Sequence, residues 1–107
     1  MSGTGTISVN RGESEITIVV KGRFNFEAHS HFRAAYQSEN ISPGPGSKRV
    51  VLDLAATDYI DSSALGMLLL LREEAGGNDA DIQIINARPE IRKILETANF
   101  QRLFKLV

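Results

Sequence analysis

Apolar and polar residues alternate near the start of the chain, and this pattern predicts a β-hairpin. Residues 6–9 alternate in this way, and residues 15–20 are rich in β-branched side chains. Residues 10–13, with the sequence Asn-Arg-Gly-Glu, supply the chemistry of the turn between them. We expect the second strand to end at Gly22.

The next apolar residues recur at helical spacing and predict a first helix over residues 26–38. Asn25 stands immediately before this helix and is a residue type favoured at a helix N-cap. Residues 40–47 contain two prolines and two glycines, which exclude regular structure and predict a loop. The first helix carries a mixed apolar stripe made of Phe26, His29, Phe32, Arg33, Ala35 and Tyr36.

The second half of the chain begins with a strongly apolar segment. Residues 50–54 are nearly all apolar, which is typical of a central strand that is covered on both faces. A second helix is predicted over residues 62–75, and Gly76 and Gly77 end it.

A further strand over residues 81–86 and a third helix over residues 89–98, with Pro89 in its first turn, complete the order β-β-α-β-α-β-α. Strand–helix–strand repeats pair in parallel through right-handed crossovers. The predicted fold class is therefore α/β, with a mixed, mostly parallel sheet and helices packed against it. The apolar residues after the third helix should pack back on the domain: Phe100, Leu103, Phe104, Leu106 and Val107.

Length and composition indicate one ordinary globular domain, residues 1–107. The hydrophobic fraction is 42% and the charged fraction 23%, so a core can form without disulfides. The chain contains no cysteine, which excludes thiolate metal sites and fits a reducing cytoplasm. A net charge of −1 without a basic stripe argues against nucleic acid as the main partner.

Two patterns argue against a membrane location. Residues 1–4 lack the charged start and the apolar core of a signal peptide. The longest apolar run, within residues 64–71, is far shorter than the ~20 residues that span a bilayer. We expect a cytoplasmic protein.

The junction Asp61-Ser62-Ser63 joins the apolar strand to the second helix and can be interpreted in two ways. Ser and Asp are common N-caps, because their side-chain oxygens accept hydrogen bonds from free backbone N–H groups. A serine here can equally be a phosphorylation site, and a phosphate adds about −1.5 to −2 charges that a helix N-terminus tolerates. Residue types alone favour the cap.

An enzymatic interpretation of Ser62 has little support. A serine nucleophile needs a base within hydrogen-bond reach, and the chain lacks the Gly-x-Ser-x-Gly turn. His29 and His31 are the only histidines, and their i, i+2 spacing directs them to different faces of the first helix. We therefore expect no catalytic triad and no shared metal site.

Three carboxylates, Asp53, Asp58 and Asp61, cluster near the end of the apolar strand. A Mg²⁺ site or acid–base chemistry is conceivable there, but capping of loops is the simpler interpretation. The chain has no phosphate-binding glycine loop, so we expect no cofactor. Gly66 inside the second helix is unusual, since glycine costs about 1 kcal/mol there, and close approach of another backbone or of a partner could explain it.

The segment Tyr-Ile-Asp-Ser-Ser-Ala-Leu-Gly over residues 59–66, together with the strand 50–54, resembles the signature of STAS domains, specifically of bacterial anti-sigma factor antagonists. Residues 20–25 and 100–104 resemble the same family's second-strand exit and closing segment. The resemblance covers nearly the whole chain. It departs from the family at Asn25, where an Asp is common, and at Ala64, where a Gly is common.

This resemblance implies a mechanism. The unphosphorylated domain binds an anti-sigma factor with serine kinase activity and so frees a sigma factor. The kinase phosphorylates Ser62, with Ser63 as second choice, and the domain dissociates until a PP2C-type phosphatase restores it. The domain is then a substrate and not an enzyme. The partner surface implied consists of Asn25, Tyr59, Ile60, Asp61, Ser63 and Met67 around Ser62.

Two other functions stay open on the sequence. Similar domains serve as accessory subunits of ABC-type lipid-transport ATPase complexes, without a phosphorylation switch. A small serine hydrolase or nucleotide-binding protein that uses Ser62 is the enzymatic alternative.

Overall fold

The computed structural model describes residues 5–107, so the expectation about a signal peptide, which rests on residues 1–4, lies outside the described residues. The strands are β1 (Thr6–Arg11), β2 (Glu15–Phe24), β3 (Arg49–Asp53), β4 (Thr57–Ile60), β5 (Ile82–Ile85) and β6 (Lys105–Leu106). The helices are α1 (His29–Tyr36), α2 (Ser62–Glu74) and α3 (Pro89–Thr97), and short 3-10 turns are η1 (Phe26–Ala28), η2 (Gly77–Asp79) and η3 (Phe100–Arg102).

The sheet is mixed, as the sequence predicts. Its strands run in the order β1-β2-β3-β5-β6, and β4 pairs with β2 outside this path. β1 and β2 form the predicted antiparallel hairpin, whereas β2–β3, β2–β4, β3–β5 and β5–β6 are parallel pairs. No helix in residues 5–107 is long and apolar enough to cross a membrane. The predicted α/β class is confirmed.

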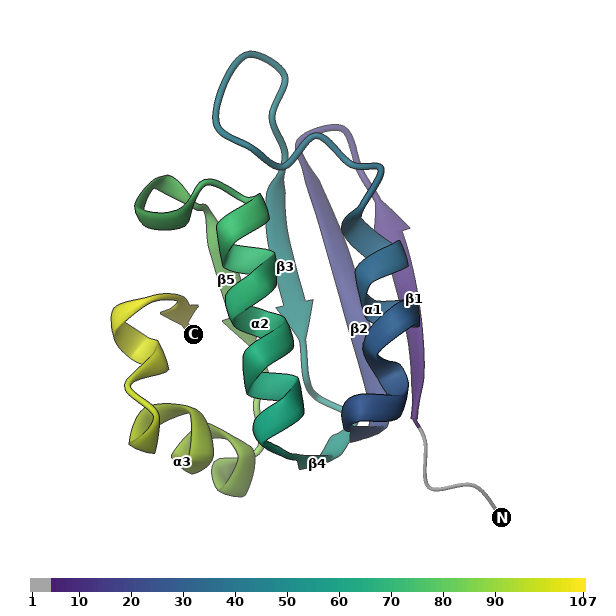
Figure 1. The fold of residues 1–107 in the computed structure, drawn as a ribbon, viewed down its shortest axis with the longest axis vertical. Coiled ribbons are helices and arrows are strands. Elements are labelled where there is room, and N and C mark those ends of the chain that lie inside the picture. The colour runs from purple at the N-terminus through teal and green to yellow at the C-terminus, as the bar shows by residue number, and fades with distance from the viewer. Residues whose placement is uncertain (1–4) are drawn as a thin grey trace.

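Helices α1 and α2 lie side by side on one face of the sheet (Figure 1). Every second residue of β2 points to them, and Ile16, Ile18 and Val20 are fully buried there. The expectation that residues 50–54 would be covered on both faces is confirmed for Val50, Val51 and Leu52, which are consecutive in β3 and all buried. On the face away from α1 and α2, Thr17 of β2 and Gln83 of β5 flank Val51 and are only half-buried.

Two strands were missing from the predicted order. β4 and β6 have four and two residues, too few for a periodic pattern to stand out. β6 belongs to the C-terminal tail, which packs back as expected through buried Phe100 and Phe104. Val107 is an exception to that expectation, since its side chain is largely exposed.

Gly22 does not end the second strand, contrary to prediction. β2 pairs with β3 as far as Val19 and then with β4 from Gly22 onward, and its register shifts between Gly22 and Arg23. Gly22 has φ +81°, a value that favours glycine, and its N–H donates to the carbonyl of Ala56 at 2.8 Å. This bulge lets one strand change partners, and it fixes β4 just before α2.

The first helix also begins later than predicted. Asn25 caps the 3-10 turn η1, and regular α-helix starts only at His29. Phe26 is therefore outside the apolar stripe expected for this helix, and the residue is 67% exposed. Phe32, Ala35 and Tyr36 form the buried face of α1.

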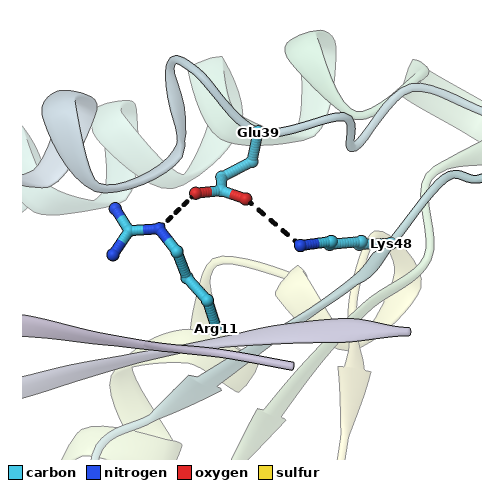
Figure 2. A network of polar contacts seen from close by, with 3 residues as sticks. All are labelled: Arg11, Glu39 and Lys48. Carbon is cyan, nitrogen blue, oxygen red and sulfur yellow. Dashed lines mark hydrogen bonds and ion pairs between the residues drawn. The ribbon is translucent and has the colours of Figure 1, made fainter. Parts of the chain in front are cut away.

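The loop between α1 and β3 is attached at the end of the sheet opposite β4 (Figure 1). Glu39 forms ion pairs with Arg11 of β1 and, at 3.6 Å, with Lys48 (Figure 2). The hydrogen bond from Arg11 is the main cause that lowers the pKa of Glu39 below its ordinary value of 4.5. Ile41 of the same loop is buried in the core.

This network predicts a pH dependence of stability. Because the folded pKa of Glu39 is depressed, its contribution is complete above the ordinary value of 4.5 and is lost as pH falls through the folded pKa. The Glu39→Gln variant should lose at most about 1 kcal/mol of unfolding free energy at neutral pH. Urea unfolding at several pH values checks this, and the difference between wild type and variant should shrink in acid. A difference that stays constant down to acid pH would contradict this assignment.

Candidate functional site at the start of helix α2

Asp61 is the N-cap of α2. Its backbone is extended, with φ −121°, and its Oδ1 accepts a hydrogen bond from the N–H of Ala64 at 3.0 Å. The carbonyl of Asp61 accepts from the N–H of Leu65. The predicted cap is thus present, and it is the carboxylate that supplies it. The hydroxyls of Ser62 and Ser63 therefore do not supply the cap.

Ser62 is the first residue of α2, and its side chain is exposed, whereas Ser63 is half-buried. In residues 5–107 no side-chain hydrogen bond engages the hydroxyl of Ser62. The N-terminal end of a helix carries a partial positive charge and free N–H groups, so negative charge is tolerated there. The geometry therefore presents an unoccupied hydroxyl at a position that can accept a phosphate.

Strand β4 holds this end of α2 in place. Thr57 is fully buried, and its Oγ1 donates to the carbonyl of Val20 at 2.7 Å. Phe24 of β2 pairs with Ile60 of β4. Asn25 directly follows Phe24 in the chain, and Asp61 directly follows Ile60. The predicted site residues Asn25 and Asp61 are thereby brought to the same edge of the sheet.

Tyr59 lies on the surface beside this edge and is 38% exposed. The guanidinium carbon of Arg23, its register partner on β2, sits 4.0 Å from the centre of the Tyr59 ring. Such a cation–π contact at an exposed site stabilises this placement of the ring by about 0.5–1 kcal/mol. Asn25 is half-buried, and its Oδ1 accepts from the N–H of Glu27 at 3.1 Å.

Two of the residues expected on the partner surface are inside the protein. Ile60 and Met67 are each only 6% exposed and belong to the core. Ile60 is a buried residue at the end of β4, and Met67 lies on the face of α2 that packs against the rest of the core. They support the surface from beneath, which corrects the expectation that they would touch a partner directly.

Several exposed apolar residues near Ser62 were missed. Phe26 stacks on His29, with ring centroids 5.7 Å apart and an interplanar angle of 6°. Leu69 and Leu70 of α2 are 41% and 54% exposed. A sequence signal existed for these leucines, because residues 68–71 are four consecutive leucines and cannot all face one side of a helix.

The other candidate groups are not brought together into a site. His29 and His31 lie in separate surface depressions, one between α1 and α2 and the other beside β1, as their spacing predicts. Asp53 accepts hydrogen bonds from the N–H of Ala55 at 3.0 Å and from Asn86 at 3.3 Å. The interpretation of Asp53 and Asp61 as capping groups is confirmed.

The cap gives a direct test of this geometry. The Asp61→Ala variant should lose about 0.5–2 kcal/mol of unfolding free energy, because the N–H of Ala64 loses its acceptor. Asp61→Asn keeps an acceptor oxygen and should stay close to wild type. Urea denaturation of the three proteins measures this, and equal stability of Asp61→Ala and wild type would contradict the cap.

Comparison with known proteins agrees with this architecture. The family model described as "Mlab, STAS domain" matches residues 7–107. A STAS-domain containing protein of Pseudomonas aeruginosa is 53% identical over 92 residues, which cover 86% of this chain and 87% of that protein. The proposed anti-sigma factor antagonist BtrV of Bordetella bronchiseptica is 32% identical over 59 residues, covering 55% of this chain and 51% of BtrV.

Solved structures show the same fold at low identity. The anti-sigma factor antagonist SpoIIAA, in its unphosphorylated form, superposes with a TM-score of 0.74 at 15% identity, covering 95% of this chain and 88% of SpoIIAA. An anti-sigma factor antagonist from Mycobacterium paratuberculosis gives 0.74 at 17% identity, covering 99% and 87%. On its sequence match over residues 7–107 and on this fold, the chain belongs to the STAS domain family.

Proposed function

We propose that this chain is an anti-sigma factor antagonist that is switched by phosphorylation of Ser62. In this proposal the unphosphorylated form binds an anti-sigma factor with serine kinase activity and so releases a sigma factor. Phosphorylation ends the binding, and a PP2C-type phosphatase restores it. The chain acts in the cytoplasm as a substrate and a switch. The observation that carries the proposal is the exposed hydroxyl of Ser62 on the first turn of α2, free of any capping duty.

The relatives support the kind of partner. SpoIIAA, similar in fold, is described as an anti-sigma factor antagonist, and BtrV, similar in sequence over about half of its length, as a proposed one. SpoIIAA was solved in an unphosphorylated form, which is the form that we assign to binding. Among the two serines, Ser62 is the better acceptor because it is exposed, whereas Ser63 is half-buried.

The surface around Ser62 suits a docked protein. The exposed part consists of Tyr59, held by Arg23, with Asn25, Asp61 and Ser63 at its edge. A phosphate at Ser62 would place about −1.5 to −2 charges in the middle of this contact. The helix end tolerates that charge, but a docked partner has to desolvate it. Binding can therefore be lost while the fold persists.

A pull-down from a lysate of the source bacterium tests the proposal, with wild type, Ser62→Ala and Ser62→Asp as baits. We expect an anti-sigma factor with a kinase domain to be recovered with wild type and Ser62→Ala and to be depleted with Ser62→Asp. Recovery of a transport ATPase with all three baits would favour the accessory-subunit alternative and contradict the switch.

The phosphorylated residue is tested with the purified kinase that the pull-down identifies. Incubation with ATP followed by mass spectrometry should place phosphate on Ser62 in wild type and give no modification in Ser62→Ala. Modification of Ser62→Ala at Ser63 would show that the other serine is the acceptor.

A further inference from the structure

Strand β1 leaves one edge of the sheet open. Among residues 5–107 it pairs with β2 alone, and it forms the outermost strand on that side (Figure 1). The N–H of Gly12 donates to the carbonyl of Glu15 at 2.8 Å, which makes these two residues a hydrogen-bonded pair of the hairpin. Since such pairs alternate along an antiparallel ladder, the backbone groups of Ile7, Val9 and Arg11 point away from β2. The edge therefore offers backbone donors and acceptors that β2 does not use.

The side chains of β1 differ between its two faces. Ile7 and Val9 are half-buried and pack against the core on the face that α1 and α2 cover. Because successive side chains of a strand point to opposite faces, the residues between and beside them lie on the other face. These residues are small, polar and exposed: Thr6, Ser8 and Asn10. An added strand would thus meet apolar side chains on one face and short polar ones on the other.

The usual protection of a sheet edge is weak along β1. Natural proteins discourage a further strand from pairing by placing charged side chains, prolines or bulges on the edge. The charged residue of β1 is Arg11, which stands at the end of the strand and pairs with Glu39. A depression of about 240 Å³ also lies beside Ile7, between β1 and α1, where Ala28 and His31 line it. It gives an apolar side chain of an added strand a place next to Ile7.

A second copy of β1 fits this edge. When two copies run antiparallel with their Ser8 residues opposite each other, Ile7 of one copy stands opposite the partner's Val9. Both residues point their backbone groups outward, so each such pair can form two hydrogen bonds while the apolar side chains meet beside the depression. A shift of the register by two residues would instead place Ile7 opposite the charged Arg11. The net charge of −1 brings little repulsion between copies.

We infer that the chain forms a homodimer through antiparallel pairing of β1, in the register that opposes the two copies of Ser8. This inference is independent of the function proposed for Ser62, because α1 lies between β1 and α2 (Figure 1). An interface of standard size buries about 800 Å² on each partner, and one short strand buries less. We therefore expect dimer and monomer in equilibrium.

Analytical ultracentrifugation of the full chain over a wide range of concentrations tests the inference. Wild type should shift from monomer to dimer as concentration rises. Ser8→Lys places like charges directly opposite each other in the dimer and should raise the dissociation constant about fivefold or more. Its urea midpoint should match wild type, because Ser8 is exposed. Ser14→Lys, the same change at an exposed position in the hairpin turn, is the matched control and should dimerise as wild type does.

The register has two tests of its own. A mixture of Ser8→Lys and Ser8→Glu should restore the dimer, since opposite charges then face each other. The chain has no cysteine, so Ser8→Cys introduces a single thiol. Residues in a non-hydrogen-bonded antiparallel pair have Cα atoms about 4.5 Å apart, which a disulfide can span. Mild oxidation should therefore link Ser8→Cys into dimers faster than Ser14→Cys.

Three results would overturn the inference. Wild type that stays monomeric at every concentration would leave the edge to a segment of another protein. A Ser8→Lys variant that dimerises as well as wild type would place the contact on another surface. Oxidation that links Ser8→Cys no faster than Ser14→Cys would exclude the register. In each case the proposed function of Ser62 stands unaffected.

Discussion

Replacing Leu68 by alanine is expected to lower the free energy of unfolding by about 2–5 kcal/mol. Leu68 is fully buried in the core beneath α2, so its removal loses apolar burial and leaves a cavity. Leu70→Ala, two residues along the same helix, should change the unfolding free energy by about 0.5 kcal/mol or less, because the Leu70 side chain is 54% exposed.

The two variants make the same Leu→Ala change, one on the buried face of α2 and one on its exposed face, so they compare the contributions of the two faces to stability. Urea unfolding monitored by circular dichroism gives both values, provided that the slope of the transition is the same in all three proteins. Similar losses from Leu68→Ala and Leu70→Ala would contradict the assignment of Leu68 to the buried face of α2 and of Leu70 to its exposed face.

Replacing Ser62 by aspartate is expected to weaken binding of the anti-sigma factor about tenfold or more without unfolding the domain. Aspartate in the first turn of a helix is stabilised by the helix dipole by about 0.3–1 kcal/mol, so the stability of the isolated chain should be equal or slightly higher. The loss of affinity follows from the cost of desolvating a charge inside a contact.

Two controls accompany this variant. Ser62→Ala should bind as wild type does, because the hydroxyl makes no hydrogen bond within residues 5–107. Ser63→Asp should perturb binding less, if the contact centres on Ser62. A Ser62→Asp protein that unfolds at lower urea than wild type would show that the helix end does not tolerate the charge.

The sequence was sufficient for those elements that are long and periodic. The hairpin, the three helices and the α/β class follow from alternation and helical spacing, and the presence of a cap within Asp61-Ser62-Ser63 follows from residue type. The sequence could not separate the cap from the phosphate acceptor, because Asp61, Ser62 and Ser63 can all cap a helix. Only the hydrogen bond from Ala64 to Asp61 makes the distinction.

The errors have physical causes as well. β4 escaped prediction because its pairing depends on a bulge at Gly22, and the bulge depends on a partner strand that lies far away in sequence. Ile60 and Met67 were expected at the surface because they stand next to Ser62 in the chain. Ile60 is instead buried where it pairs with the buried Phe24 of β2, and the helical period of α2 turns Met67 into the core.

The outer face of α2 lay outside the sequence argument for a different reason. The four consecutive leucines over residues 68–71 signal that some of them face outward, but the sequence does not say which ones. Their exposure, and the open space around Gly66, became visible only when the whole fold was assembled.

The central claim is that phosphate on Ser62 controls binding, and one calorimetric titration tests it most directly. The purified anti-sigma factor is titrated with unphosphorylated chain and with chain carrying phosphate on Ser62 alone, as verified by mass spectrometry. We predict measurable binding for the first and a loss of about tenfold or more in affinity for the second. Equal affinity of the two forms would contradict the claim.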